Sequence, residues 1–522
     1  MRYGVMVHES TKTVSLGVSG VSFEDVIAVA RHHAKVVMNP DALAAIAKTR
    51  TFIDEYAAGG VPVYGVSTGF GALANRHIDV KDRTQLQKSL IRSHAAGVGP
   101  SVEDEVVRAL MFLRLRTMAS GRTGVRVAVA QIYADFLNAG ITPIVPEFGS
   151  LGCSGDLAPL SHCALAMMGE GRVHDATGKE MASLDAMRPA GITPIELEAK
   201  EGLALINGTD GMLGMLIMAC ADLYQLCTVA DITAAMSIEG LLGTDRVFAP
   251  DLHLPLRPQL GQAVSAANIF AMLRNSGIVA SHLENDSRVQ DAYSLRCAPQ
   301  VAGAVRDTVD YASTIAAREL QSSIDNPVVL PDGRVESNGN FHGAPLAYVL
   351  DFLAIAATDL GSISERRTDR MLDQHRSAGL PPFLANDPGV DSGLMIAQYT
   401  QAALVSENKR LATPASVDSI PSSGMQEDHV SMGWSAARKL RKVVENLSRI
   451  LAIELVTAAR AIEFRKEFTP APATANVIKE LRTVVGGIGP DRFLSPELEA
   501  AVSLVQSGRV VKAAKEVVSA LQ

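Results

Sequence analysis

The sequence predicts a mainly α fold: a bundle of long helices with a smaller mixed region on its N-terminal side. Apolar side chains recur at spacings of three and four from residue 436 to residue 464, which is the period of a helix buried along one face. Aromatic residues make up only 5% of the chain, so Ala, Leu, Val, Ile and Met must fill the core. These residues suit helices packed closely on helices.

The N-terminal region combines short elements of both kinds. Weak alternation over residues 11–18 predicts a short strand. Amphipathic spacing predicts helices over residues 23–35 and 40–57, and the second begins at a proline. We expect this mixed region to extend over residues 1–210.

The remainder, residues 211–522, is expected to be the long-helix bundle. The helical spacing at residues 436–464 lasts about 29 residues, or roughly 43 Å of helix. Three further stretches share this spacing: residues 301–320, 345–370 and 394–411. Long helices with few charges are typical of a bundle shared between subunits. A hairpin is expected at residues 327–337, where Pro-Asp-Gly predicts a turn.

Composition limits the classes of partner and the compartment. With 48 Lys and Arg against 56 Asp and Glu, the net charge is −8, which argues against nucleic acid or an anionic membrane as a partner. The most apolar window, residues 211–221, ends at Asp222, short of the ~20 residues of a membrane span. The five cysteines form no Cys-x-x-Cys pair, so we expect a reducing cytoplasm.

The sequence shows no spacing that is typical of common cofactor sites. None of the twelve histidines forms a zinc-type pattern, and the glycines form no phosphate-binding motif. We therefore expect neither a metal nor a nucleotide.

Three glycine-rich segments stand out, at residues 63–72, 149–156 and 207–211. In the second, Gly155 follows Ser154, and glycine leaves the backbone unusually free. If the loop is compressed, the Gly155 nitrogen can attack the Cys153 carbonyl carbon. Loss of water, including the Ser154 hydroxyl, would then leave a ring with an exposed methylene, which is a strong electrophile. From the residues alone, a tight, solvent-excluded turn is the favoured interpretation.

Residues 153–160, Cys-Ser-Gly-Asp-Leu-Ala-Pro-Leu, closely resemble the Ala-Ser-Gly-Asp-Leu-x-Pro-Leu motif of the aromatic amino acid ammonia-lyase family. The resemblance extends over roughly residues 14–468, with several motifs in the family's order. It implies a long-helix bundle of the ammonia-lyase and fumarase type. It also implies a homotetramer whose active sites each draw on three chains, and a self-made 4-methylidene-imidazol-5-one (MIO) group formed from Cys153, Ser154 and Gly155. Cys153 replaces the usual alanine, but only its backbone enters the ring.

The resemblance also implies catalytic roles. Tyr64, in the Tyr-Gly-Val-x-Thr-Gly-Phe-Gly motif, corresponds to the base that removes the β-proton. A free phenol has a pKa of about 10, so its surroundings must tune it. Tyr293, in a Gln-Asp-x-Tyr-Ser-x-Arg stretch, would assist proton transfer. Asp156 would support ring closure, or cap the helix that follows it.

Further positions correspond to binding residues. Arg296 presents a planar fork suited to a carboxylate, while Asn207 and Gln290 offer neutral donors for the MIO oxygen or the carboxylate. Phe341, in Gly-Asn-Phe-His, would form the wall beside the MIO, and His94 lies where the family contacts the substrate ring. As residues alone, these five could equally serve as ion pairs, caps, turns or core.

The substrate is predicted from Glu427. Its string, Gln-Glu-Asp-His-Val-Ser-Met, resembles histidine ammonia-lyases, and its carboxylate can accept a hydrogen bond from an imidazole or act as a base. A salt bridge is the structural alternative. We expect a carbon–nitrogen lyase that converts L-histidine to trans-urocanate.

Two active alternatives and one inactive alternative remain open. Gly424 removes a methyl near the pocket and would admit a larger ring, which favours a tyrosine ammonia-lyase giving p-coumarate. A 2,3-aminomutase shares the early steps. An inactive relative acting as a binding protein is disfavoured, because Tyr64, Ser154 and Gly155 are all present.

Overall fold

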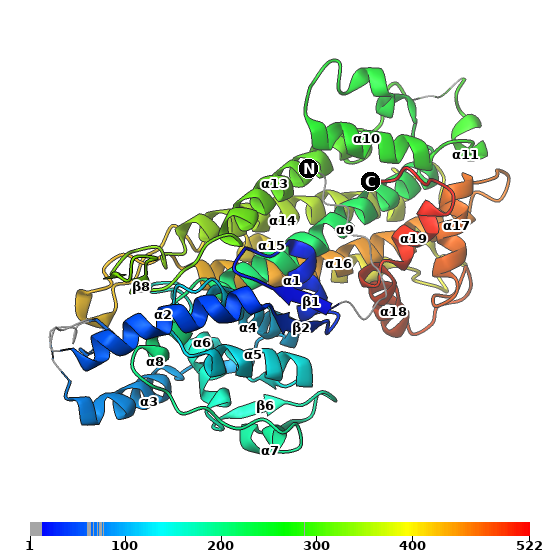
Figure 1. Ribbon diagram of the computed structural model, residues 1–522. Coiled ribbons are helices and arrows are strands. Elements are labelled where there is room, and N and C mark those ends of the chain that lie inside the picture. Colours follow the sequence, from blue (N-terminus) through cyan, green and yellow to red (C-terminus); the bar gives the residue numbers. More distant parts are fainter. Residues whose placement is uncertain are drawn as a thin grey trace. The chain divides into compact units, whose positions relative to one another are not determined.

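Long helices dominate the chain (Figure 1), and the predicted mainly helical fold is confirmed. The computed structural model describes residues 13–59, 64–65, 67–69, 71, 76, 78–284, 286 and 288–522. Contacts divide the chain into two units. Unit 1 comprises Met1–Met218, Ser313–Leu350 and Pro414–Arg438, and unit 2 comprises Ala219–Ala312, Asp351–Thr413 and Lys439–Gln522. The predicted division at residue 210 stays a prediction.

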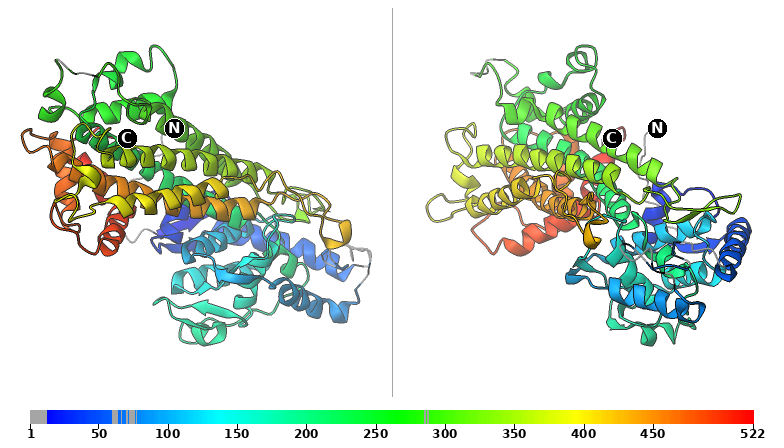
Figure 2. Two further views of the ribbon diagram at one scale, coloured as in Figure 1. Left: turned by 180° about the vertical axis from the view of Figure 1, so that it is seen from behind. Right: turned by 90° about the vertical axis from the view of Figure 1, so that its left-hand side faces the viewer.

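Unit 2 contains most of the length of five long helices, which run side by side (Figures 1 and 2). These helices are α9 (Asp210–Gly240), α13 (Ala298–Glu319), α14 (Ala344–Leu372), α15 (Met395–Leu411) and α16 (Gly433–Glu463). The four long helices predicted from apolar spacing are all present. In α16 the apolar positions that predicted the helix, from Leu440 to Ile462, are buried. Burying this face is what stabilises so long a helix.

A buried carboxylate ties three of these helices together. Glu454 on α16 is fully buried, and its oxygens accept hydrogen bonds from Thr233 and Ser237 on α9 and from Ser364 on α14. Arg367 on α14 donates to both oxygens. The charge is thus paired and fully hydrogen-bonded, which is the condition for burying it.

In the part of the chain that the structure describes, two helices are long and apolar enough to cross a membrane by length and composition, namely α9 and α14. The expectation that the apolar stretch ends at Asp222 is wrong for the helix, because α9 continues to Gly240. In the most apolar windows of α9 and α14, 78% and 61% of the residues are buried inside the protein. Packing against neighbouring helices therefore accounts for their apolar character.

Unit 1 begins with a parallel strand pair. Strand β1 (Thr13–Leu16) pairs with β2 (Lys35–Met38), and α1 (Phe23–Ala30) connects them. The predicted strand is confirmed, but the helix predicted over residues 23–35 is too long. The chain turns after Ala30, because the alternating buried residues of β2 pair with β1 in the core.

Helix α4 (Asp104–Ala119) forms the centre of unit 1, and all of its residues from Val106 onward are buried. It packs against α1, α2 (Pro40–Ala58) and α5 (Val127–Ala139). Three arginines on α4 are buried with it: Arg108, Arg114 and Arg116.

The remaining elements are short. In unit 1 they are α3 (Arg83–His94), β3 (Val98–Ser101), β4 (Thr142–Pro143), β5 (Pro146–Phe148), α6 (Leu157–Met167), β6 (Arg172–His174), β7 (Glu180–Ala182), α7 (Ser183–Met187), α8 (Glu201–Ile206), β8 (Val328–Val329) and β9 (Val335–Glu336). In unit 2 they are α10 (Leu260–Met272), α11 (Gly277–Ala280), α12 (Tyr293–Arg296), α17 (Pro472–Leu481), α18 (Ser495–Gln506) and α19 (Arg509–Lys515). The pairing of β8 with β9 confirms the predicted hairpin.

Candidate active site

The loop before α6 is compressed against a second loop of unit 1. Gly155 has a φ of +79° and forms an isolated parallel bridge with Gly208. A Cβ on Gly155 would lie 2.1 Å from the Gly208 carbonyl oxygen, so only glycine fits there. This close backbone approach confines Gly155, and the Cys-Ser-Gly residues at this position are of the kind from which an MIO group could form.

Asp156 holds this arrangement from inside the protein. Its fully buried carboxylate accepts hydrogen bonds from Ser150 Oγ (3.0 Å) and from the backbone nitrogens of Gly211 (3.0 Å) and Met212 (2.9 Å). The prediction that it caps its own helix is wrong, since its side chain makes no capping bond to α6. It caps the first turn of α9 instead. Burial raises the pKa of the Asp156 carboxyl to about 7.

Glu427 lies directly at the candidate electrophile. Ser154 Oγ donates to Glu427 Oε1 at 2.8 Å, and Ser422 Oγ donates to the other oxygen at 2.9 Å. Backbone pairing between Ser422 and Glu427 holds the carboxylate in place. Among the described residues Glu427 forms no ion pair, and the hydroxyls of Ser154 and Ser422 donate to its carboxylate. The pKa of the Cys153 thiol is raised to about 12, mainly by burial and secondly by the charge of Glu427.

Tyr64 lies in the electrostatic field of the same carboxylate. Its Oη accepts a hydrogen bond from Gly71 N at 3.2 Å. Burial raises the phenol pKa above its usual value, and the Glu427 charge adds to this effect. A Cβ on Gly71 would lie 2.8 Å from Ser423 Oγ, so this loop borders the Glu427 loop. Of the segment 63–72, residues 63, 66, 70 and 72 lie outside the described residues.

His94 ends α3 and is half-buried. Its Nδ1 lies 3.0 Å from Ser93 Oγ. Burial lowers the imidazole pKa, while Glu427 acts in the opposite direction. The neutral ring is therefore favoured, and a neutral imidazole can both donate and accept a hydrogen bond.

Asn207 and Phe341 are also placed in unit 1. The Asn207 side chain is buried, and its Oδ1 has no hydrogen-bond partner among the described residues. Phe341 is half-buried and precedes His342, whose ring stacks on that of His429 at 5.6 Å between centroids. His429 follows Glu427 by two residues, so the stack brings the Phe341 and Glu427 segments together.

The stacked histidines, His342 and His429, and Ser422 were not predicted as parts of this site. Both histidines stand inside the motifs quoted for Phe341 and Glu427, so their side chains were visible as candidates. Ser422 carried no signal of its own, because its role depends on the backbone pairing with Glu427.

The other three candidates form a separate cluster in unit 2. Arg296 Nη2 donates to Gln290 Oε1 at 3.0 Å, and the guanidinium lies 4.5 Å from the centre of the Tyr293 ring. Tyr293 is 71% exposed. Gln290, Tyr293 and Arg296 are therefore grouped together, and the ring of Tyr293 is open to a partner.

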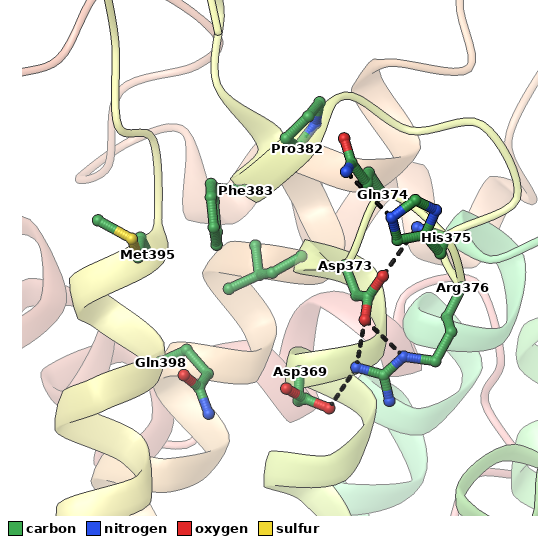
Figure 3. A pocket seen from close by; sticks show the side chains of 10 residues that line it. Asp369, Asp373, Gln374, His375, Arg376, Pro382, Phe383, Met395 and Gln398 are labelled. Carbon is green, nitrogen blue, oxygen red and sulfur yellow. Dashed lines mark hydrogen bonds and ion pairs between the residues drawn. The ribbon is translucent and has the colours of Figure 1, made fainter. Parts of the chain in front are cut away.

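A cavity of about 330 Å³ also lies in unit 2, beside the end of α14 and the start of α15 (Figure 3). Its carboxylates are already paired: Arg376 contacts both Asp369 and Asp373. Phe383 and Met395 line its apolar side. None of the residues predicted for the active site lines it.

The site in unit 1 thus combines three functions. A Ser-Gly loop can supply an electrophile, a carboxylate can hold or deprotonate a bound group, and a phenol can exchange a proton. All three act within one electrostatic field, since the Glu427 charge affects the pKa values of Tyr64, His94 and Cys153.

The family described as aromatic amino acid lyase matches residues 21–483 of the chain. A histidine ammonia-lyase from Streptomyces griseus is 65% identical over 512 residues, covering 98% of this chain and 99% of the relative. Among solved structures, a tyrosine aminomutase from Streptomyces globisporus superimposes with a TM-score of 0.90 at 38% identity, covering 96% of this chain and 98% of that one. A histidine ammonia-lyase from Trypanosoma cruzi gives 0.88 at 38% identity, covering 97% and 96%.

Proposed function

The chain belongs to the aromatic amino acid lyase family, and from this premise we propose that it eliminates ammonia from L-histidine to give trans-urocanate. It is a carbon–nitrogen lyase. The observation that carries the choice of substrate is the position of Glu427, whose Oε1 lies 2.8 Å from Ser154 Oγ before the ring forms. It places a carboxylate able to bind an imidazole N–H directly at the reacting group.

We propose that Cys153, Ser154 and Gly155 form the MIO group autocatalytically. The proposal is supported by the Gly155–Gly208 contact, which leaves no room for a Cβ. When formed, the group supplies an electrophile that captures the substrate amine and makes ammonia a better leaving group.

The remaining chemistry falls to side chains of the chain. Glu427 and His94 hold the imidazole of the substrate. A carboxylate can accept a hydrogen bond from the ring N–H, and a neutral imidazole can donate one to the other ring nitrogen. Tyr64 removes the β-proton as the phenolate. Phe341 packs beside the substrate and Asn207 orients polar oxygens.

The exposed cluster of unit 2 is assigned to the substrate carboxylate. Arg296 binds the carboxylate through its planar fork, Gln290 orients that fork, and Tyr293 assists proton transfer. We propose that these residues act in a homotetramer in which each active site draws on three chains. The exposed ring of Tyr293 supports this assignment. We place the enzyme in the cytoplasm, which the free thiols of all five cysteines support.

A tyrosine-specific enzyme or aminomutase is the second candidate, because the tyrosine aminomutase structure superimposes so well. Gly424, which would admit a larger substrate ring, also has a role in the backbone. Gly424 has a φ of +61° in a 3₁₀ turn, so glycine serves the backbone there.

The test is to incubate the purified protein separately with L-histidine, L-tyrosine and L-phenylalanine and to follow the ultraviolet absorbance of each unsaturated acid. We expect urocanate from histidine alone, and an intact mass lower by two water molecules. Glu427→Gln should reduce kcat/KM for histidine by about 10²–10⁴-fold. Glu170→Gln is the control, because that carboxylate pairs with Arg92 at the surface.

Coumarate from tyrosine would contradict the proposed substrate. A full-length mass without the loss of two waters would contradict the MIO group. An unchanged kcat/KM in Glu427→Gln would remove Glu427 from the site.

A further inference from the structure

We propose that Arg114 is a positioning residue for the autocatalytic ring closure, acting through the backbone of Asn207 and Gly208. The inference rests on the proposed MIO function and extends it to a residue outside the reacting segment. Arg114 lies on α4, and its side chain is fully buried.

Arg114 binds the backbone immediately before Gly208. Its Nη1 donates to the Asn207 carbonyl oxygen at 2.7 Å, and its Nη2 donates to the Ile324 carbonyl oxygen at 2.7 Å. The two guanidinium nitrogens thus bind two chain segments that are far apart in the sequence. A guanidinium presents such a pair of donors in fixed geometry, whereas an ammonium does not.

Gly208 is held between Arg114 and Gly155. A Cβ on Gly208 would lie 2.6 Å from Arg114 Nη1 and 2.4 Å from Asp210 Oδ2. The Gly208 carbonyl oxygen accepts a hydrogen bond from Asp156 N at 2.8 Å. The Gly208 backbone is therefore packed against Arg114 and Asp210 while it is bonded to the loop that must cyclise.

The segment that contains Gly208 is secured at both ends. Arg114 holds the Asn207 carbonyl at one end, while the Asp156 carboxylate holds the nitrogens of Gly211 and Met212 at the other. The Arg114 and Asp210 side chains lie 3.5 Å apart, which adds an attraction between opposite charges. Because α4 is the buried centre of unit 1, its packing holds the Arg114 side chain in place. Arg114 in turn restricts the movement of the segment that contains Gly208.

Ring closure needs that rigidity. The Gly155 nitrogen forms a bond to the Cys153 carbonyl carbon, and the carbonyl oxygen leaves as one water with two protons from the backbone. Ser154 then loses its hydroxyl and its α-proton as a second water, which leaves the exocyclic methylene. No oxidant or reductant takes part. Holding the reacting atoms in contact is the principal aid the protein can give such a step.

The test compares two buried arginines of the same helix. Arg114→Lys and Arg114→Gln are prepared alongside Arg108→Gln. Arg108 is equally buried, but it donates to the carbonyls of Val29, Ala30 and Leu137, away from the loop. Intact mass at successive times after synthesis gives the fraction of each chain that has lost two waters. Thermal unfolding measures the stability of each variant.

We expect both Arg114 variants to close the ring more slowly than wild type, by on the order of tenfold to a hundredfold. Arg108→Gln should close it at the wild-type rate even though it is less stable. Activity per closed ring should stay near wild type in Arg114→Lys, since its defect is in maturation.

Wild-type rates of closure in both Arg114 variants would overturn the inference. It would also be overturned if Arg108→Gln were equally slow, because general destabilisation would then explain the defect. A wild-type protein without any loss of two waters would instead refute the proposed MIO function.

Discussion

The charge of Glu427 affects the pKa values of three other residues of the candidate site. It accepts hydrogen bonds from Ser154 and Ser422. It also acts to raise the pKa values of Tyr64, His94 and Cys153. Burial counteracts this effect at His94, where the net pKa is lowered. One carboxylate thus favours a protonated phenol and a protonated thiol in the resting site.

The raised pKa of Tyr64 leads to a prediction about pH. Tyr64 must be a phenolate to act as a base, and below its pKa the phenolate fraction grows about tenfold per pH unit. We expect kcat/KM for histidine to rise with pH from neutrality into the alkaline range.

Tyr64→Phe should lose about 10²–10⁴-fold in rate. In Glu427→Gln the alkaline limb of the residual activity should move to lower pH, because a charge that raises the phenol pKa is gone.

The measurement is a pH–rate profile of the wild type and of both variants. Lys179, an exposed side chain in a turn of unit 1, provides the control variant Lys179→Gln. A wild-type profile that stays flat between pH 7 and the usual phenol pKa of about 10 would rule out Tyr64 as the base.

Helix α16 shows how a long helix is stabilised by more than its apolar face. Its buried Glu454 accepts hydrogen bonds from three hydroxyls and pairs with Arg367 on α14. Removing one partner of a buried pair leaves the other charge uncompensated, which costs about 3–5 kcal/mol. This network therefore determines how α9, α14 and α16 are joined within unit 2.

We expect Glu454→Gln to lower the free energy of unfolding by about 3–5 kcal/mol. Glu445 on the same helix is the matched control, because its carboxylate is partly exposed and pairs with Lys442 and Arg449. Glu445→Gln should cost at most about 1 kcal/mol. Denaturant unfolding of both variants measures the difference, and equal stabilities would show that the buried network contributes no more than the surface pair.

At the scale of the whole molecule, unit 2 exposes large apolar side chains on its long helices. They lie on three neighbouring elements: Tyr311 on α13, Phe352 and Ile355 on α14, and Ile396 and Tyr399 on α15. Exposed large apolar side chains occur on surfaces that bind another protein. They support the proposed homotetramer, in which further copies of the chain would cover them.

Shared active sites can be tested by complementation. Tyr64→Phe and Arg296→Gln homotetramers should each be nearly inactive. When the two chains are co-expressed in equal amounts, about a quarter of the sites should receive an intact Tyr64 from one chain and an intact Arg296 from another. Turnover of histidine by the purified mixed oligomers should recover to that extent. No recovery in oligomers shown to contain both chains would contradict sites shared between chains.

Much of this protein could be predicted from its sequence because local physics decides it. The apolar spacing at residues 436–464 predicts α16, since a buried face repeats with the helical period. The hairpin at residues 327–337 follows from turn chemistry. The motifs around Tyr64, Ser154 and Glu427 identified the family and its chemistry without any coordinates.

Only the tertiary structure decided which of these residues meet. The bond between Ser154 and Glu427 joins residues 273 positions apart, and no local pattern encodes such a distance. Asp156 caps α9 rather than its own helix, and residues 35–38 form a strand because β1 lies beside them. Arg114 reads from the sequence as one arginine among many, and its role depends on the carbonyls that face it across the buried core. Local spacing specifies elements and motifs, whereas packing decides the partners of their side chains.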